Sequence, residues 1–98
     1  MASDTDTRIV DDAEESRFAL WGQDTCIGFI GYHVEDDVIV LVHTEVDPAF
    51  GGQGHGATLV RGALDAARER GLKVRPDCPF VASFIDEHEE YADLLATS

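Results

Sequence analysis

The feature that most constrains the fold is a glycine-rich stretch that separates an apolar segment from an amphipathic one. The apolar segment covers Val38–Val46 and the amphipathic one covers Ala57–Arg70. Their order predicts a strand, a turn and a helix. The first N–H groups of a helix lack partners and carry partial positive charge, and glycine lets backbone approach a ligand closely. The turn therefore predicts a phosphate or pyrophosphate site. Four of the nine glycines of the chain lie in it, at Gly51, Gly52, Gly54 and Gly56.

Two common phosphate motifs do not fit this turn. A Walker loop ends in Gly-Lys-Ser/Thr, whereas Gly56 is followed by Ala57 and Thr58. The dinucleotide fingerprint requires G-x-G-x-x-G, and the run from Gly52 to Gly56 is one residue too short for it. A chain of 98 residues is also too short for the two βαβ halves of the dinucleotide-binding fold.

The turn is similar to a third motif, the acyl-CoA loop of the GNAT acetyltransferase superfamily, written (Gln/Arg)-x-x-Gly-x-(Gly/Ala). Gly54, His55 and Gly56 match the second half of this motif. Gly51 stands where the motif begins with Gln or Arg, and a glutamine lies nearby at Gln53. The resemblance implies that acetyl-CoA is the ligand of the turn.

The resemblance covers the chain from Thr25 to Leu95. Val46–Phe50 resembles the strand end and bulge that precede the acyl-CoA loop. Residues 78–95 resemble the C-terminal end of a group of small single-domain members of about this length, with Glu89 where that group often has proline. The implied fold is a minimal GNAT-like α+β domain, with helices packed on a mixed, mostly antiparallel sheet.

The periodicity of the chain predicts the element order β-β-β-α-β-α-α. Short connections predict that the first three strands form an antiparallel meander, and the right-handed crossover rule makes the fourth strand parallel to the third. Gly28 and Gly31 indicate a bulge or close packing within the second strand. The predicted strands are Arg17–Trp21, Thr25–Val34, Val38–Val46 and Leu72–Arg75, and the predicted helices are Ala57–Arg70, ended by Gly71, then Phe80–His88 and Glu89–Ala96.

The first sixteen residues are predicted to be an acidic, partly flexible arm, and residues 17–96 a single domain. Arg8–Val10 could add a short strand to the sheet. Larger members of the superfamily place two helices between their first two strands, and those helices wall the acceptor site. The chain has no room for them between Trp21 and Thr25, so the resemblance implies an open acceptor side.

The composition excludes several partners and locations. A net charge of −13 argues against nucleic acid and against anionic membranes, and it favours a cationic acceptor. No apolar run approaches the roughly 20 residues of a membrane span, and the N-terminus lacks a signal-peptide pattern. Cys26 and Cys78 are too far apart to indicate a disulfide framework or a metal site. We expect a cytoplasmic protein with no metal, as a monomer or weak dimer.

The positive charge is not spread evenly over the chain. A local basic zone could attract the phosphates of CoA, or its members could be solvent-facing residues paired with acids such as Asp65 and Glu69. Both interpretations stay open from the sequence, and only one or two of these residues need to touch the ligand. Five of the seven basic residues follow the glycine turn, namely Arg61, Arg68, Arg70, Lys73 and Arg75.

The resemblance also implies which residues line the ligand. Thr44, Glu45 and Val46 would line the pantetheine arm. Backbone N–H groups from Gly51 through Ala57 would hold the pyrophosphate, Cys78 would lie near the end of the thioester, and Phe80 would also contact the cofactor. The cofactor-binding set of the turn is therefore Gly51, Gly52, Gln53, Gly54, His55, Gly56 and Ala57. The alternative for the turn is an ordinary helix start without a ligand.

Acyl transfer from a thioester to an amine requires a rigidly held thioester, a polarised carbonyl and a proton acceptor. His43 and Glu45 are two residues apart on a strand and share a face, so either could accept the proton. We favour Glu45 as the base, with His43 and water left open. Cys78 could be a covalent acyl acceptor if the following helix start lowers its pKa, or it could be a packing thiol.

Two functions follow from the sequence. The first is an acetyl-CoA-dependent N-acetyltransferase that transfers the acetyl group directly to a primary amine of unknown identity. The alternative is a non-catalytic CoA-binding or interaction module on the same fold, because no base is obvious and the acceptor wall is missing. A small acidic partner protein with an empty turn is a third reading, kept open by the departure at Gly51.

Overall fold

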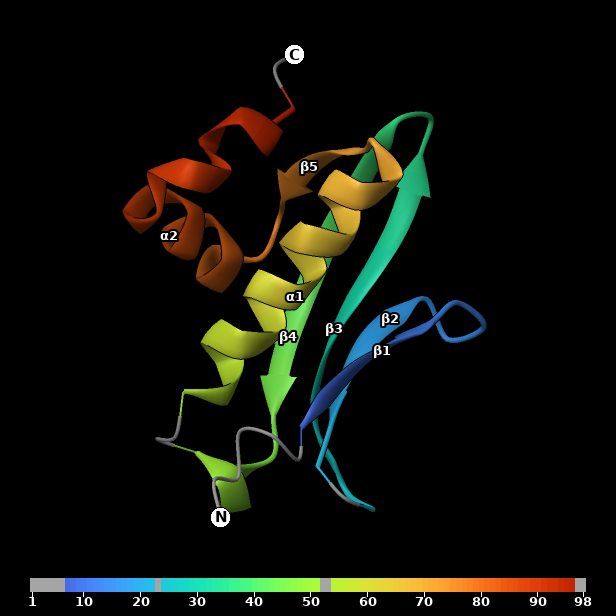
Figure 1. The fold of residues 1–98 in the computed structure, drawn as a ribbon, viewed down its shortest axis with the longest axis vertical. Coiled ribbons are helices and arrows are strands. Elements are labelled where there is room, and N and C mark those ends of the chain that lie inside the picture. Colours follow the sequence, from blue (N-terminus) through green and yellow to red (C-terminus); the bar gives the residue numbers. More distant parts are fainter. Residues whose placement is uncertain (1–6, 23, 52–53, 97–98) are drawn as a thin grey trace.

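The sheet has five strands in the part of the chain that the structure, a computed structural model, describes, which is residues 7–22, 24–51 and 54–96. The strands lie in sequence order across the sheet (Figure 1). Antiparallel pairs join the first four strands, and the fourth and fifth are parallel. The elements are β1 (Arg8–Asp12), β2 (Arg17–Trp21), β3 (Cys26–Glu35), β4 (Val38–Val46), η2 (Pro48–Phe50), α1 (His55–Arg70), β5 (Lys73–Pro76), α2 (Pro79–Glu87) and η3 (Glu89–Leu94).

The predicted α+β class with a mixed, mostly antiparallel sheet is confirmed. One strand precedes the predicted order, because β1 pairs along its full length with β2. The sheet therefore begins inside the segment predicted to be an arm, at the residues where a short strand was considered. The last predicted helix is a 3₁₀ segment, η3, and Leu95 after it forms a bridge to Val74 of β5.

Helix α1 lies across one face of the sheet and supplies much of the core (Figure 1). Its buried residues follow the helical period and form a single stripe. The strands alternate, so Phe18, Leu20 and Ile30 also face α1. Gly71 ends the helix in the left-handed conformation, with φ at 72°, as predicted from the sequence. The buried stripe is Leu59, Val60, Ala63, Leu64 and Ala67.

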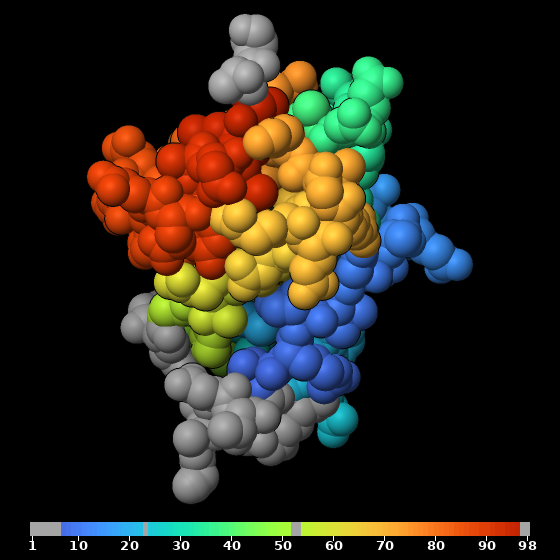
Figure 2. All heavy atoms as spheres, turned by 45° about the horizontal axis from the view of Figure 1, so that its top comes forward, coloured from blue at the N-terminus to red at the C-terminus, as the bar shows by residue number. Residues whose placement is uncertain are grey.

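The C-terminal segment packs against the second half of α1, and Figure 2 shows these red residues lying on the orange part of the helix. Arg68 donates hydrogen bonds to both carboxylate oxygens of Asp93, at 2.9 and 3.1 Å. One turn earlier, Asp65 accepts a hydrogen bond from the Tyr91 hydroxyl at 3.2 Å. These contacts hold η3 and α2 on the same side of the sheet as α1. No helix in the described ranges has the length and apolar character needed to span a bilayer.

Candidate functional site

Strand β4 has two halves with different surroundings. Val38–Leu41 pairs with β3 on one side and with β5 on the other. After Leu41 the parallel pairing ends, the Cys78 amide donates to the Leu41 carbonyl at 3.1 Å, and the chain turns into α2. Within the described residues, Val42–Val46 pairs with β3 alone. The edge of this half that faces away from β3 is therefore free of a strand partner.

A bulge marks the boundary between the two halves. Gly31 pairs with His43 and Tyr32 pairs with Leu41, so Val42 is the extra residue on β4. The bulge or close packing predicted from Gly28 and Gly31 is thus present. Gly28 shows the close packing, since a Cβ there would lie 2.5 Å from the Glu45 carbonyl oxygen.

His43 and Glu45 share a face of β4, as predicted, and it is the face turned away from α1. Their side chains are 63% and 62% exposed, and His43 Nε2 lies 4.0 Å from a Glu45 carboxylate oxygen. Phe29 lies beside them, with ring centroids of Phe29 and His43 6.3 Å apart, and the Arg17 guanidinium is 5.1 Å from the Phe29 centroid. Both candidate bases are therefore open to solvent.

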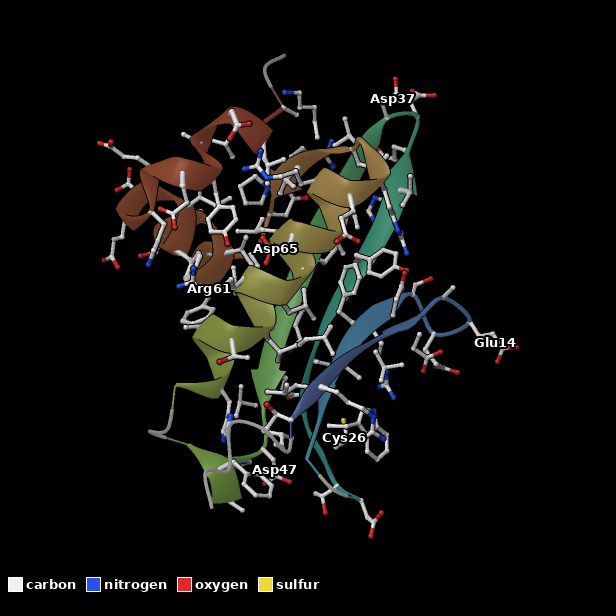
Figure 3. All side chains as sticks on the ribbon, in the orientation of Figure 1. Glu14, Cys26, Asp37, Asp47, Arg61 and Asp65 are labelled. Atoms are coloured by element: carbon white, nitrogen blue, oxygen red, sulfur yellow. The ribbon has the colours of Figure 1, made fainter. Side chains whose placement is uncertain are left out.

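A hollow of about 410 Å³, which the sequence did not predict, adjoins Glu45 on this face. Phe29 and Arg17 line one part of it, and Asp47 lies at its edge. Figure 3 shows Asp47 and Cys26, another lining residue, at the end of the molecule where α1 begins. The signal that could have found it is strand alternation, which puts Arg17, Phe29 and Glu45 on one face.

Thr44 faces the other way and contacts Cys78, the residue just before α2. Cys78 Sγ lies 3.4 Å from Thr44 Oγ1, and the thiol is buried. Burial raises the pKa of the Cys78 thiol, but hydrogen bonds from Thr44 and from the N–H groups of Val81 and Phe80 outweigh it. The net effect is that the pKa of Cys78 is lowered, as expected for a thiol at a helix start.

The start of α1 has no side-chain cap. Gly54 is its N-cap residue, in the left-handed conformation at φ 79°, and no side chain in the described part of the chain caps the first turn. A helix start normally takes Ser, Thr, Asp or Asn at this position to satisfy a free N–H group. The first turn of α1 also contains no acidic residue. Its amides and its partial positive charge are therefore available to an anion.

Only some of the amides that were predicted to bind phosphate are free to do so. The Gly51 amide donates to the Pro48 carbonyl at 3.1 Å and closes η2. Gly52 and Gln53 lie outside the described residues. His55, Gly56 and Ala57 form the first turn of α1, which begins two residues before the predicted start.

Phe80 lies next to this turn, although it follows Gly56 by 24 positions in the chain. A Cβ on Gly56 would be 3.0 Å from the Phe80 ring. The ring is nevertheless 46% exposed. The structure thus brings together three residues of the predicted cofactor-binding set, Gly56, Ala57 and Phe80.

Three of the five basic residues after the turn have close acidic or carbonyl partners within the protein. Arg68 pairs with Asp93 and lowers the pKa of that carboxyl. Arg70 pairs with Asp11 of β1. Lys73 donates to the Asp93 carbonyl at 2.8 Å. These residues hold the fold together rather than form a free basic zone.

The remaining two are less firmly paired. Arg75 lies 3.2 Å from Asp77 and 3.7 Å from Glu35, on the far side of the sheet from α1. Arg61 lies 3.8 Å from Glu90, beyond hydrogen-bonding distance, and its side chain is 47% exposed. Figure 3 shows Arg61 on the side of α1 that faces α2. Among the five, Arg61 is the basic residue nearest the helix start, and besides Glu90 it interacts with the Tyr91 hydroxyl.

Comparison with known proteins is consistent with this geometry. The model of the GCN5-related N-acetyltransferase family matches residues 17–94. No match was found among curated protein sequences. A GCN5-like protein of Staphylococcus aureus, solved by NMR, superposes with a TM-score of 0.71 at 26% identity, over 96% of this chain and 92% of the other.

Two larger structures are also similar. A Mycobacterium tuberculosis protein solved in complex with CoA has a TM-score of 0.61 at 26% identity, over 79% of this chain and 50% of its own. A ribosomal-protein-alanine N-acetyltransferase of Brucella melitensis has a TM-score of 0.54 at 20% identity, over 84% and 64%. The second of these supports the fold alone.

Proposed function

The chain belongs to the GCN5-related N-acetyltransferase family, and we propose on that premise that it binds acetyl-CoA and transfers the acetyl group to a primary amine. The observation that carries the proposal is the uncapped start of α1 beside the unpaired half of β4. The diphosphate would meet free N–H groups at the start of α1, and the pantetheine arm would meet the free backbone edge of β4. The CoA-bound relative from Mycobacterium tuberculosis supports the same ligand.

The diphosphate would accept hydrogen bonds from the free N–H groups of the first turn of α1. Gly54, His55, Gly56 and Ala57 form this turn and its cap. A side chain at position 56 would crowd the Phe80 ring, since an added Cβ would lie 3.0 Å from it, so Gly56 lets Phe80 lie against this turn. The first-turn dipole favours negative charge, which matters in a protein of net charge −13.

The pantetheine arm would lie along the unpaired edge of β4 and take backbone hydrogen bonds from it. Side chains alternate along this half, so Thr44 and Val46 face α1 while the Glu45 side chain faces the opposite side. The backbone of Glu45 would therefore bind the pantetheine arm, and its carboxylate would face the amine acceptor. The thioester would end near Thr44 and Cys78.

The reaction would begin when Glu45 accepts a proton from the ammonium of the acceptor. The neutral nitrogen then attacks the thioester carbonyl carbon, and backbone N–H groups stabilise the oxyanion. The carbon–sulfur bond breaks and the surplus proton on the nitrogen passes to the sulfur, so CoA leaves as the thiol. His43 and water are the other candidate bases. The hollow beside Glu45, with Phe29 and Asp47 on its walls, would receive the acceptor, and the acidic surface favours a cationic one.

Direct transfer is the route we propose, with Cys78 as a residue that shapes the thioester end. The lowered pKa of Cys78 leaves a second route open, in which its thiolate takes the acetyl group and then gives it to the amine. Mass spectrometry after mixing with acetyl-CoA alone separates the two. Only the second route adds an acetyl group to a peptide containing Cys78.

A second candidate function is a CoA-binding module without catalysis. The exposure of His43 and Glu45 and their 4.0 Å separation favour it, since neither side chain makes a hydrogen bond within the described residues. Thermal shifts with acetyl-CoA, CoA and ATP test binding, and thioester consumption over a panel of amines tests chemistry. A shift with CoA species plus amine-dependent release of CoA supports the transferase. A shift with no release from any amine supports the module, and no shift with either CoA species contradicts both.

A further inference from the structure

The hollow beside Glu45 is lined by groups of opposite charge on different strands. Its volume of about 410 Å³ lies within the roughly 300–1,000 Å³ of pockets that hold small molecules. Arg17 of β2 and Glu45 of β4 both line it, and Phe29 of β3 lies between them. Because neighbouring strands are about 4.8 Å apart, the backbones of Arg17 and Glu45 are about 10 Å apart across the sheet. Within the described residues, these two side chains do not form an ion pair with each other.

The Arg17 side chain is held in place without having its hydrogen bonds satisfied. Its guanidinium lies 5.1 Å from the centroid of the Phe29 ring, a cation–π contact that uses no N–H group. Asp12 is its one ion-pair partner in the described ranges, and the Asp12 carboxylate is 3.9 Å from Nε, beyond hydrogen-bonding distance. Nε is buried and has no hydrogen-bond partner among the described residues. Such a group is rare in folded proteins, so the guanidinium is suited to an anion from outside the chain.

Glu45 is the free anion of the hollow. Its carboxylate is 62% exposed and lies 4.0 Å from His43 Nε2. The other carboxylate of the lining, that of Asp47, is already used, because it accepts a hydrogen bond from the Ala49 amide at 2.9 Å and caps η2. An ammonium group that enters the hollow would therefore pair with Glu45.

The surface between the two charges is apolar and open. Phe29 is directly opposite Glu45 in the strand register. Two residues further along β3, Gly31 pairs with Arg17 on one side and His43 on the other. A Cβ added to Gly31 would have no atom within 4 Å, so no side chain fills the space above it. A short hydrocarbon chain could lie here, against the Phe29 ring.

We propose that the acceptor is an amino carboxylate, a small molecule with a primary amine at one end, a carboxylate at the other and a few methylene groups between them. Arg17 binds the carboxylate, whose two oxygens match a planar guanidinium, and Phe29 supports the chain. The ammonium reaches Glu45. Asp12 also lies near the guanidinium, so it weakens the binding of the carboxylate.

The inference rests on the proposed function and names its substrate class. The ammonium and the thioester yield an N-acetyl amino carboxylate, CoA as the thiol and one proton, which Glu45 accepts and passes to solvent. The positive charge favoured by the acidic surface is thus confined to the reacting end of the acceptor.

The test compares amines that differ only in the carboxylate. Steady-state release of CoA is measured with γ-aminobutyrate, δ-aminovalerate and ε-aminocaproate, each against the n-alkylamine with the same number of carbons. The enzymes are wild type, Arg17→Gln and Arg75→Gln. Arg75 is the matched control, because it is also on the face of the sheet away from α1 and is 50% exposed, but it does not line the hollow. Thermal melting and calorimetry with CoA verify that each variant is folded and binds the cofactor.

In wild type, kcat/KM for the amino carboxylate of the best length should exceed that of its alkylamine about 10- to 100-fold, as expected for hydrogen bonds between charged groups. Arg17→Gln should remove most of this preference and change kcat/KM for the alkylamine by less than about threefold. Arg75→Gln should keep it. Equal values within all three pairs in wild type, or a preference that survives in Arg17→Gln, overturn the proposal and leave the proposed function intact.

A binding measurement on wild type keeps the test independent of turnover and of the folding of a variant. The Nε–H group of Arg17 is buried, so its proton is protected from exchange and gives its own signal in ¹⁵N NMR. With CoA bound, at least one of the three amino carboxylates should shift this signal, and its alkylamine should leave it in place. A signal that none of the amino carboxylates moves would contradict the proposal. If neither kind of amine releases CoA, the proposed function fails and this inference with it, so the two failures are distinguishable.

Discussion

The two halves of β4 belong to one strand but differ in burial and in pairing. In Val38–Leu41, the side chains of Ile39, Val40 and Leu41 have no exposed surface, and strands pair on both sides. In Val42–Val46, Val42 is 45% exposed, His43 and Glu45 are in solvent, and one edge has no strand partner in the described residues. The comparison indicates that the first half anchors the sheet so that the second can leave its backbone free.

The largest expected contrast is in stability. Leu41→Ala should lower the free energy of unfolding by about 2–5 kcal/mol, because it empties a fully buried position. Val42→Ala, one residue further, should cost less than about 1 kcal/mol because the side chain is half in solvent. Urea unfolding of the two variants measures both values. Similar losses would show that the second half is as tightly packed as the first.

The second contrast is between binding and chemistry at Glu45. Glu45→Gln should lower kcat/KM for the best amine about 100-fold, at the low end for loss of a general base, and leave the Kd for CoA unchanged. Steady-state kinetics and calorimetry on the same sample measure the two quantities. A loss of less than about threefold would indicate that His43 or water, and not Glu45, is the general base. A matching loss of CoA affinity would make Glu45 a ligand contact.

Two glycines on β3 test how closely β3 approaches the exposed half of β4. Gly28→Ala should destabilise the protein by about 1–3 kcal/mol, since the new Cβ would lie 2.5 Å from the Glu45 carbonyl oxygen and backbone has to shift. Gly31→Ala, where no atom lies within 4 Å of the added Cβ, should change stability by less than about 0.5 kcal/mol. Thermal or urea unfolding distinguishes them. Equal effects would refute the close approach at Gly28.

The smallest expected effect is a shift in the titration of Cys78. Its lowered pKa means that the thiolate is present at a lower pH than for a free cysteine, whose pKa is roughly 8.5. Thr44→Val removes one hydrogen bond that lowers the pKa and leaves the burial that raises it, so the midpoint should move to higher pH. The rate of alkylation by iodoacetamide against pH, in a Cys26→Ser background, gives the midpoint. An unchanged midpoint would mean that Thr44 does not stabilise the thiolate.

Much of the fold could be predicted because local signals agree with tertiary packing. β4 runs from Val38 to Val46 as predicted, since an apolar run is bounded by acidic turn residues before it and by Asp47-Pro48 after it. The buried stripe of α1 and its glycine stop also follow from local pattern. Both signals depend only on residues close together in the chain.

What could not be predicted depends on partners distant in sequence. β1 is acidic and half exposed, and only its pairing with β2 makes it a strand. The basic residues after the turn look alike in sequence, yet Arg68 and Arg70 meet acids from other elements and Arg61 does not do so tightly. The Gly51 amide is used by η2, which no glycine pattern indicates.

The central claim is that CoA lies along the unpaired half of β4 with its diphosphate on the first turn of α1. An NMR titration of ¹⁵N-labelled protein with CoA tests it directly, because each backbone amide reports separately. The account predicts that the amide signals of Gly54–Ala57 and Thr44–Val46 shift on saturation, while those of Val38–Leu41 stay in place. Saturable binding that leaves the amides of Gly54–Ala57 unmoved would contradict it.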